Sequence, residues 1–264
     1  MSNEKLEVIE FEDPIAKEIC VSNWGGHYID GEITTKEAAA VTTIRPTSSN
    51  RYFNGCQMTK FNEFKYFVGL TELSATNSAN DGAFQGCTKL QEITLPKLNI
   101  TSGGIFNGSI FRICRALEEV DLSPWATSVG VNLYCMFTMA GVTKVDLRPF
   151  KTISAASNLF ACNATYPSKL EELNTEGCTF GATALSTSAF SACSKLTTII
   201  GGFAGHKGSI SLSSCPLTRE SALVVLNSLA TANSGATITF KASTYNMLTA
   251  EDKQIGIDKG YSIQ

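Results

Sequence analysis

Residues 84–96 read Phe-Gln-Gly-Cys-Thr-Lys-Leu-Gln-Glu-Ile-Thr-Leu-Pro, and the same order of residue types returns along the chain. Residues 111–124 repeat it, with Phe111, Cys114 and Leu117 at the corresponding places. Less regular copies lie at residues 190–199, at residues 137–149 with Ala140 in place of the cysteine, at residues 160–173 with an insertion after Cys162, and without a cysteine at residues 67–73. The chain is therefore built from repeats.

The spacing and inner pattern of the copies predict stacked strands. Their first aliphatic residues lie at positions 70, 90, 117, 142, 170 and 196, so successive copies are 20 to 28 residues apart. This period, with the pattern Leu-x-x-Ile-x-Leu, is typical of leucine-rich repeats. Ile93 and Leu95 are two residues apart and would share the inner face of a strand, whereas Glu92 and Thr94 would face outward. A single copy cannot bury its apolar side, so the sequence predicts an α/β repeat solenoid.

The unit Phe-x-x-Cys-x-x-Leu-x-x-Ile-x-Leu-Pro resembles the BspA-type leucine-rich repeats of bacterial surface proteins, which are common in gut Bacteroides. The resemblance covers about residues 50–215 and is most specific at residues 84–96 and 111–124. It implies a right-handed solenoid with a parallel β-sheet and a place on the cell surface or outside the cell. It also implies a role in adhesion, by binding host proteins or glycans.

The two flanks are expected to cap the ends of the repeat, because terminal units of a stack normally shield its apolar ends. We expect an N-terminal cap over residues 1–49, the repeats over residues 50–215 and a C-terminal αβ cap over residues 216–264, giving helical or αβ caps at both ends. In the last segment, Thr218 is placed to cap a helix over residues 219–230, and residues 237–240 alternate like a strand. A second helix is expected from Thr249 to Gly260, with residues 261–263 returning as a strand.

The N-terminal flank contains a loop similar to half of an EF-hand or dockerin calcium loop. Asp30, Gly31, Ile33 and Glu37 match loop positions 5, 6, 8 and 12 of that motif. Positions 1 and 3 would be Gly26 and Tyr28, which carry no carboxylate. We therefore expect a degenerate loop without a metal ion, with a weak calcium site as the alternative, and we expect no cofactor elsewhere.

Composition excludes several classes of function. The chain carries 21 Lys and Arg against 24 Asp and Glu, and a nucleic-acid binder would need clustered basic residues. No run of 18 apolar residues is present, so no membrane insertion is expected. The nine cysteines are spread evenly without close pairs, which disfavours zinc sites and favours small buried thiols. There are only two histidines and no catalytic signature, so we expect no enzymatic activity.

The expected outward faces of the strands form the candidate binding site. Two rows are expected, the first made of Glu72, Glu92, Glu119, Lys144, Glu172 and Thr198, and the second of Ser74, Thr94, Asp121, Asp146, Asn174 and Ile200. All of them except Ser74, Thr198 and Ile200 are the nine candidate binding residues. Neighbouring strands lie about 4.8 Å apart, so these residues would form an acidic stripe. The stripe serves either solubility alone or the binding of a protein with a basic surface or, less well without aromatic residues, of a glycan.

These observations predict a non-enzymatic protein-binding or adhesion module. The leading alternative is a structural or receptor-binding component of a phage-like particle. It is suggested by the C-terminal segment, which resembles the ends of such repeat proteins, and by residues 1–8, which lack the basic and apolar pattern of a secretory signal. The identity of the partner stays open.

Overall fold

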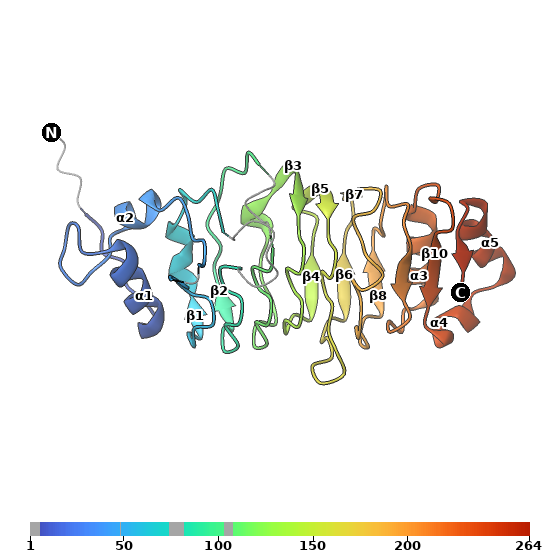
Figure 1. Ribbon diagram of the computed structural model, residues 1–264, viewed down its shortest axis with the longest axis horizontal. Helices are drawn as coiled ribbons and strands as arrows, with labels where there is room; N and C mark the ends of the chain where they lie inside the picture. Colours follow the sequence, from blue (N-terminus) through green and yellow to red (C-terminus); the bar gives the residue numbers. More distant parts are fainter. Residues whose placement is uncertain (1–5, 48, 74–81, 103–107) are drawn as a thin grey trace.

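The computed structural model describes residues 6–47, 49–73, 82–102 and 108–264. Successive segments of the chain lie side by side along the long axis of an elongated molecule, with the first and the last helix of the chain near opposite ends (Figure 1). One cluster of buried apolar side chains extends from Ile9 to Tyr261. The stack is thus held by a core that passes through all the layers.

The N-terminal end is closed by two helices, α1 (Pro14–Trp24) and α2 (Thr35–Ala40). Asp13 caps α1, because its carboxylate accepts hydrogen bonds from the backbone N–H groups of Ile15 and Ala16. Thr34 and Glu37 form a capping box at the start of α2, in which each side chain accepts from the other residue's backbone N–H.

The central part contains two lines of short strands (Figure 1). The first line consists of β1 (Lys60–Phe61), β2 (Glu92–Ile93), β4 (Lys144–Asp146), β6 (Glu172–Asn174) and β8 (Thr198–Ile200). The second consists of β3 (Thr127–Asn132), β5 (Phe150–Ala155) and β7 (Thr179–Phe180). In the described residues, one 3-10 helix, η1 (Asn62–Tyr66), directly follows β1, and another, η3 (Ser123–Trp125), precedes β3. All pairings within these lines are parallel.

The C-terminal end combines β9 (Ile210–Leu212), α3 (Arg219–Ser228), β10 (Thr237–Phe240), α4 (Ala242–Met247), α5 (Ala250–Asp258) and β11 (Ser262–Ile263). Its three strands form a parallel sheet in the order β11-β10-β9. The helices expected after Thr218 and Thr249 are α3 and α5; Thr218 caps α3 as predicted, and Thr249 caps α5. The strands expected at residues 237–240 and 261–263 are β10 and β11, so these local predictions are confirmed.

The expected fold class, a right-handed leucine-rich-repeat solenoid with a parallel β-sheet and capped ends, is wrong. Within the described residues, the strands form four separate sheets of two or three strands, and segment 118–121 belongs to none of them. All five strands of the first line span two or three residues, and at the ends of β4 and β6 a side-chain hydrogen bond turns the chain. The copies are therefore stacked strand fragments without one continuous sheet.

A column of phenylalanine rings forms the centre of the core. Phe84, Phe111, Phe137, Phe160 and Phe190 are buried, and each ring stacks on the next with centroids 5.8 to 5.9 Å apart. Such aromatic pairs stabilise a core beyond the apolar area that they bury. The phenylalanine that opens each copy is thus the main packing residue between layers.

The cysteines of the copies lie beside this column. The thiol of Cys87 donates to the carbonyl oxygen of Phe53, and that of Cys114 donates to Phe84, both at 3.0 Å. All nine cysteines are free thiols, and seven are buried. Each of these two cysteines therefore links its own layer to the preceding one through a hydrogen bond, which a purely apolar side chain could not make.

Burial of the thiols predicts a loss of stability at alkaline pH. Burial raises the pKa of Cys162 and of Cys178 to about 11, whereas an unfolded cysteine ionises near ~8.5. The thiols stay protonated to a higher pH in the folded protein than in the unfolded chain. Their contribution to the free energy of unfolding is therefore complete below pH ~8.5 and is lost as the pH rises to about 11. Calorimetry between these values should show a falling Tm. The fall should be smaller in the double variant C162A/C178A, and an identical fall would contradict the burial of these thiols.

Candidate functional site

Two adjoining hollows lie where the first line of strands is interrupted. One, of about 430 Å³, lies between β2 and segment 118–121 and is lined by Asn62, Glu92 and Glu118 among others. The other, of about 370 Å³, extends from the same segment to β4 and β6 and is lined by Lys144, Asp146, Arg148, Glu172 and Asn174. Both are lined by Glu119, Val120 and Asp121. We call the two hollows together the acidic groove.

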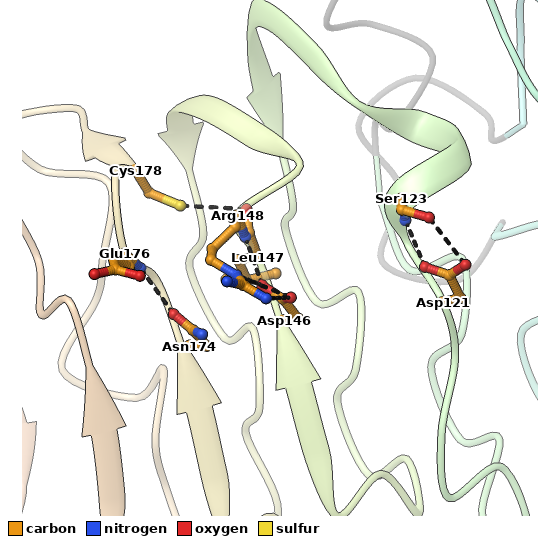
Figure 2. Close-up of polar contacts among 8 residues, drawn as sticks. All are labelled: Asp121, Ser123, Asp146, Leu147, Arg148, Asn174, Glu176 and Cys178. Carbon is orange, nitrogen blue, oxygen red and sulfur yellow. Dashed lines mark hydrogen bonds and ion pairs between the residues drawn. The ribbon is translucent and has the colours of Figure 1, made fainter.

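Three residues of the second predicted row form turns in the chain (Figure 2). The side-chain oxygens of Asp121, Asp146 and Asn174 accept hydrogen bonds from backbone N–H groups two residues later, at 2.9 to 3.0 Å. This is the Asx turn that short polar side chains make with their own backbone. These residues therefore end the strands and turn the chain, and they also line the groove.

Asp146 and Asp121 differ in charge balance. Arg148 binds both carboxylate oxygens of Asp146 at 2.7 to 3.0 Å, and this hydrogen bonding is the main reason why the pKa of Asp146 lies below its usual value (Figure 2). The other carboxylate oxygen of Asp121 accepts from the Ser123 hydroxyl at 2.9 Å. Within the described ranges, neither Asp121 nor Glu119 forms an ion pair. The uncompensated negative charge of the groove is thus centred on these two residues.

Glu92 has a lysine as its strand neighbour. Lys60 is its partner across the β1–β2 pair, and the Lys60 ammonium lies 3.2 Å from Glu92 and 3.4 Å from Glu12. The hydrogen bond to Glu92 is the first cause of the raised pKa of Lys60. In the β4–β6 pair, Lys144 likewise stands opposite Glu172. Opposite charges therefore face each other in both sheets, and Lys60, which was not expected, interrupts the expected acidic stripe beside Glu92.

Glu72 does not belong to the groove, contrary to its expected place in the first row. It pairs with Thr43 in an isolated parallel bridge, because the segment stacked below β2 is Lys60–Phe61 and not residues 67–73. Thr94 also lies outside the lining residues, and its hydroxyl donates to Asn62 at 2.9 Å. Ser74 lies outside the described residues. The other seven predicted residues, Glu92, Glu119, Asp121, Lys144, Asp146, Glu172 and Asn174, line the groove.

The sequence held a signal for the missed neighbour Lys60. Phe53, Cys56, Met58 and Phe61 have the same spacing as Phe137, Ala140, Val142 and Val145, so residues 53–61 are a further copy of the shorter repeat. In this copy methionine and phenylalanine stand where the others carry aliphatic residues. Residues 67–73, which carry Leu70 and Leu73, therefore match the leucine pattern better than residues 53–61 do.

The calcium-like loop uses its carboxylate within the protein. Glu37 accepts hydrogen bonds from the backbone N–H groups of His27 and Thr34 and from the Thr34 hydroxyl, at 2.7 to 2.8 Å. Burial alone would raise the pKa of Glu37, but these hydrogen bonds outweigh it and lower the pKa. Asp30 is exposed. No group of three or more His, Cys, Asp or Glu that could hold a metal ion is found among the residues described.

Comparison with known proteins adds no relative. No family model matches the sequence, and no curated protein or solved structure proved similar to it. The resemblance to BspA-type repeats therefore stays a prediction. Within the described part of the chain, no helix combines the length and apolarity needed to cross a bilayer.

Proposed function

We propose that the protein is a non-enzymatic binding module that holds a basic segment of a partner protein in the acidic groove. The observation that carries this proposal is the pair Glu119 and Asp121, which line both hollows and which form no ion pair within the described residues. A lysine or arginine side chain of a partner would supply the missing positive charge.

The lining of the groove favours a protein over a glycan. Six of its carboxylates come from Glu92, Glu118, Glu119, Asp121, Asp146 and Glu172, whereas its cations are Lys144 and Arg148. None of the lining residues is aromatic, although sugar-binding sites commonly stack rings on the ligand. Exposed ion pairs contribute only about 0.2–1 kcal/mol each, so a peptide with several basic residues fits the groove better than a single cation. The adhesion role implied by the BspA-type resemblance agrees with this partner.

Titration with a short lysine- and arginine-rich peptide tests the proposal. We expect saturable binding that weakens as salt rises, because screening acts strongly on exposed charges. The double variant E119Q/D121N should bind about tenfold more weakly, since two exposed ion pairs together contribute on the order of 1–2 kcal/mol. Asparagine at position 121 keeps the turn, because Asn174 makes the same hydrogen bond in a neighbouring copy.

Glu72→Gln is the matched control for this titration. It removes one exposed carboxylate that lies outside the groove, so the affinity for the peptide should not change. An equal loss in E72Q and E119Q/D121N would mean that only the overall charge matters and would refute the groove. Equally tight binding of an acidic peptide would refute the proposed partner chemistry.

A further inference from the structure

A further hollow, in addition to the two of the acidic groove, lies beside the insertion that interrupts one copy of the repeat. Residues 163–169 form the loop that reaches below the other loops near β6 (Figure 1). The hollow beneath it measures about 340 Å³, and its walls include Arg115, Met139, Tyr166, Pro167 and Lys195. None of the residues that line it lines the acidic groove. It is therefore a separate site.

The loop is held in place by several polar contacts. The Asn163 side chain accepts from the backbone N–H of Tyr166 at 2.9 Å, and the backbone N–H of Ser168 donates to Ala192 at 3.1 Å. Lys169, at the end of the loop, pairs with Glu118 at 3.2 Å. The wall that the loop contributes is thus already formed before any ligand arrives, which lowers the entropic cost of binding.

Arg115 is the polar group that points to the chemistry of the hollow. Its guanidinium carbon lies 3.5 Å from the centroid of the Tyr166 ring. Its Nε is buried and has no hydrogen-bond partner, and within the described ranges the side chain forms no ion pair. A buried donor without an acceptor costs about 1–3 kcal/mol. The ring fixes the plane of a guanidinium whose donor fork matches a carboxylate, and no carboxylate of the residues described pairs with it.

The remaining walls define what else the ligand must carry. Lys195 lines the hollow without an ion-pair partner in the described part of the chain, and Lys169 is compensated by Glu118. Apolar surface comes from Met139, Ala140 and Pro167. We propose that this hollow binds a small organic carboxylate with a compact apolar body. Arg115 would take the carboxylate through two hydrogen bonds, Lys195 would add charge, and the apolar wall would cover the body.

Benzoate is a suitable probe, because it combines a carboxylate with a flat apolar ring. Titration followed by NMR should give saturable shifts for residues around Arg115 and Tyr166. Benzyl alcohol has nearly the same shape without the charge, and it should bind at least tenfold more weakly. Shifts that do not saturate, or equal affinity for both compounds, would overturn the proposal.

Variants locate the interaction. Arg115→Gln should weaken benzoate binding at least tenfold, whereas Lys253→Gln should leave it unchanged. Lys253 is a matched control, because its ammonium lies over the ring of Tyr245 at 3.7 Å, at the far end of the molecule. Unchanged binding in R115Q would refute the assigned role of the guanidinium.

Variants of Lys195 and Tyr166 test the proposal if R115Q does not fold. Lys195→Gln should weaken benzoate binding about threefold, because an exposed charge contributes roughly 0.2–1 kcal/mol. Tyr166→Phe should retain full binding and Tyr166→Ala should lose it, since the ring and not its hydroxyl orients the guanidinium. The opposite pattern would overturn the site. E119Q/D121N should bind benzoate normally, so failure here and failure of the proposed protein-binding function can be told apart.

Discussion

Replacing Phe111 with alanine is expected to lower the free energy of unfolding by about 3–5 kcal/mol. The Phe111 ring is fully buried and stacks on Phe84, Phe137 and Trp125. Its removal leaves a cavity in the middle of the column, where neighbouring layers cannot close without losing their own stacking. Urea denaturation followed by circular dichroism measures the change.

Val68→Ala serves as the control for this measurement. Val68 is 48% exposed, so its truncation should change the free energy of unfolding by no more than about 0.5 kcal/mol. A loss below about 1 kcal/mol in F111A would fall well short of the cost of a buried phenylalanine. It would show that the ring column does not join the layers.

Gly141→Ala is expected to lower the free energy of unfolding by about 2–3 kcal/mol or more. A Cβ at this position would collide with the backbone carbonyl oxygen of Arg115 and come within 3.2 Å of that of Leu117. The two copies approach closely here, since the Gly141 N–H donates to the Cys114 carbonyl oxygen at 3.0 Å. Relief would require the backbones of two layers to separate.

Gly130→Ala is the matched control, because a Cβ there meets only side-chain atoms of Thr152 and Ser154 at 3.6 to 3.7 Å. This is ordinary van der Waals contact, and the change in stability should stay within about 0.5–1 kcal/mol. Thermal unfolding of both variants compares the two sites. Equal losses in G141A and G130A would contradict the close approach of the layers at Gly141.

The repeat pattern predicted what lies inside the molecule but not how far the sheet extends. The phenylalanine of each copy and most of the aliphatic residues that follow it are buried, as alternation requires, whereas Ile93 and Val120 are partly buried. The pattern could not show that the side chains of Asp146 and Asn174 accept backbone hydrogen bonds and form turns, because the same residues are acceptable on an exposed strand. Local hydrogen bonding therefore limits the length of β4 and β6, whereas the first line of strands is interrupted at segment 118–121, which forms no strand.

The sequence also did not predict the backbone conformation of the turn that follows each phenylalanine. The residue two places after the phenylalanine has a left-handed φ in several copies, namely +76° at Gly86, +64° at Ile113, +54° at Met139 and +56° at Ala192. Glycine adopts this conformation readily, whereas a β-branched isoleucine rarely does. Among these four residues, only Gly86 is of a type that predicts a left-handed φ from the sequence. At the other positions the packing between layers imposes the turn against the local preference.

The candidate sites were predictable to different degrees. Strand period placed seven of the nine proposed residues along the acidic groove and misplaced Glu72, because the wrong segment was chosen as its layer. The hollow beside Arg115 could not be found from the sequence. It depends on contact between Arg115 and Tyr166, 51 residues apart, and on an insertion that the repeat pattern treats as an irregularity.

The central claim, that the acidic groove holds a basic segment, is tested most directly by hydrogen exchange of the protein with and without a saturating lysine- and arginine-rich peptide. The claim predicts slower exchange of backbone amides in residues 118–121 and 144–148, which line the groove. Residues 71–73, which include the excluded Glu72, should exchange at an unchanged rate. Protection at residues 71–73 without protection at residues 118–121 would contradict it.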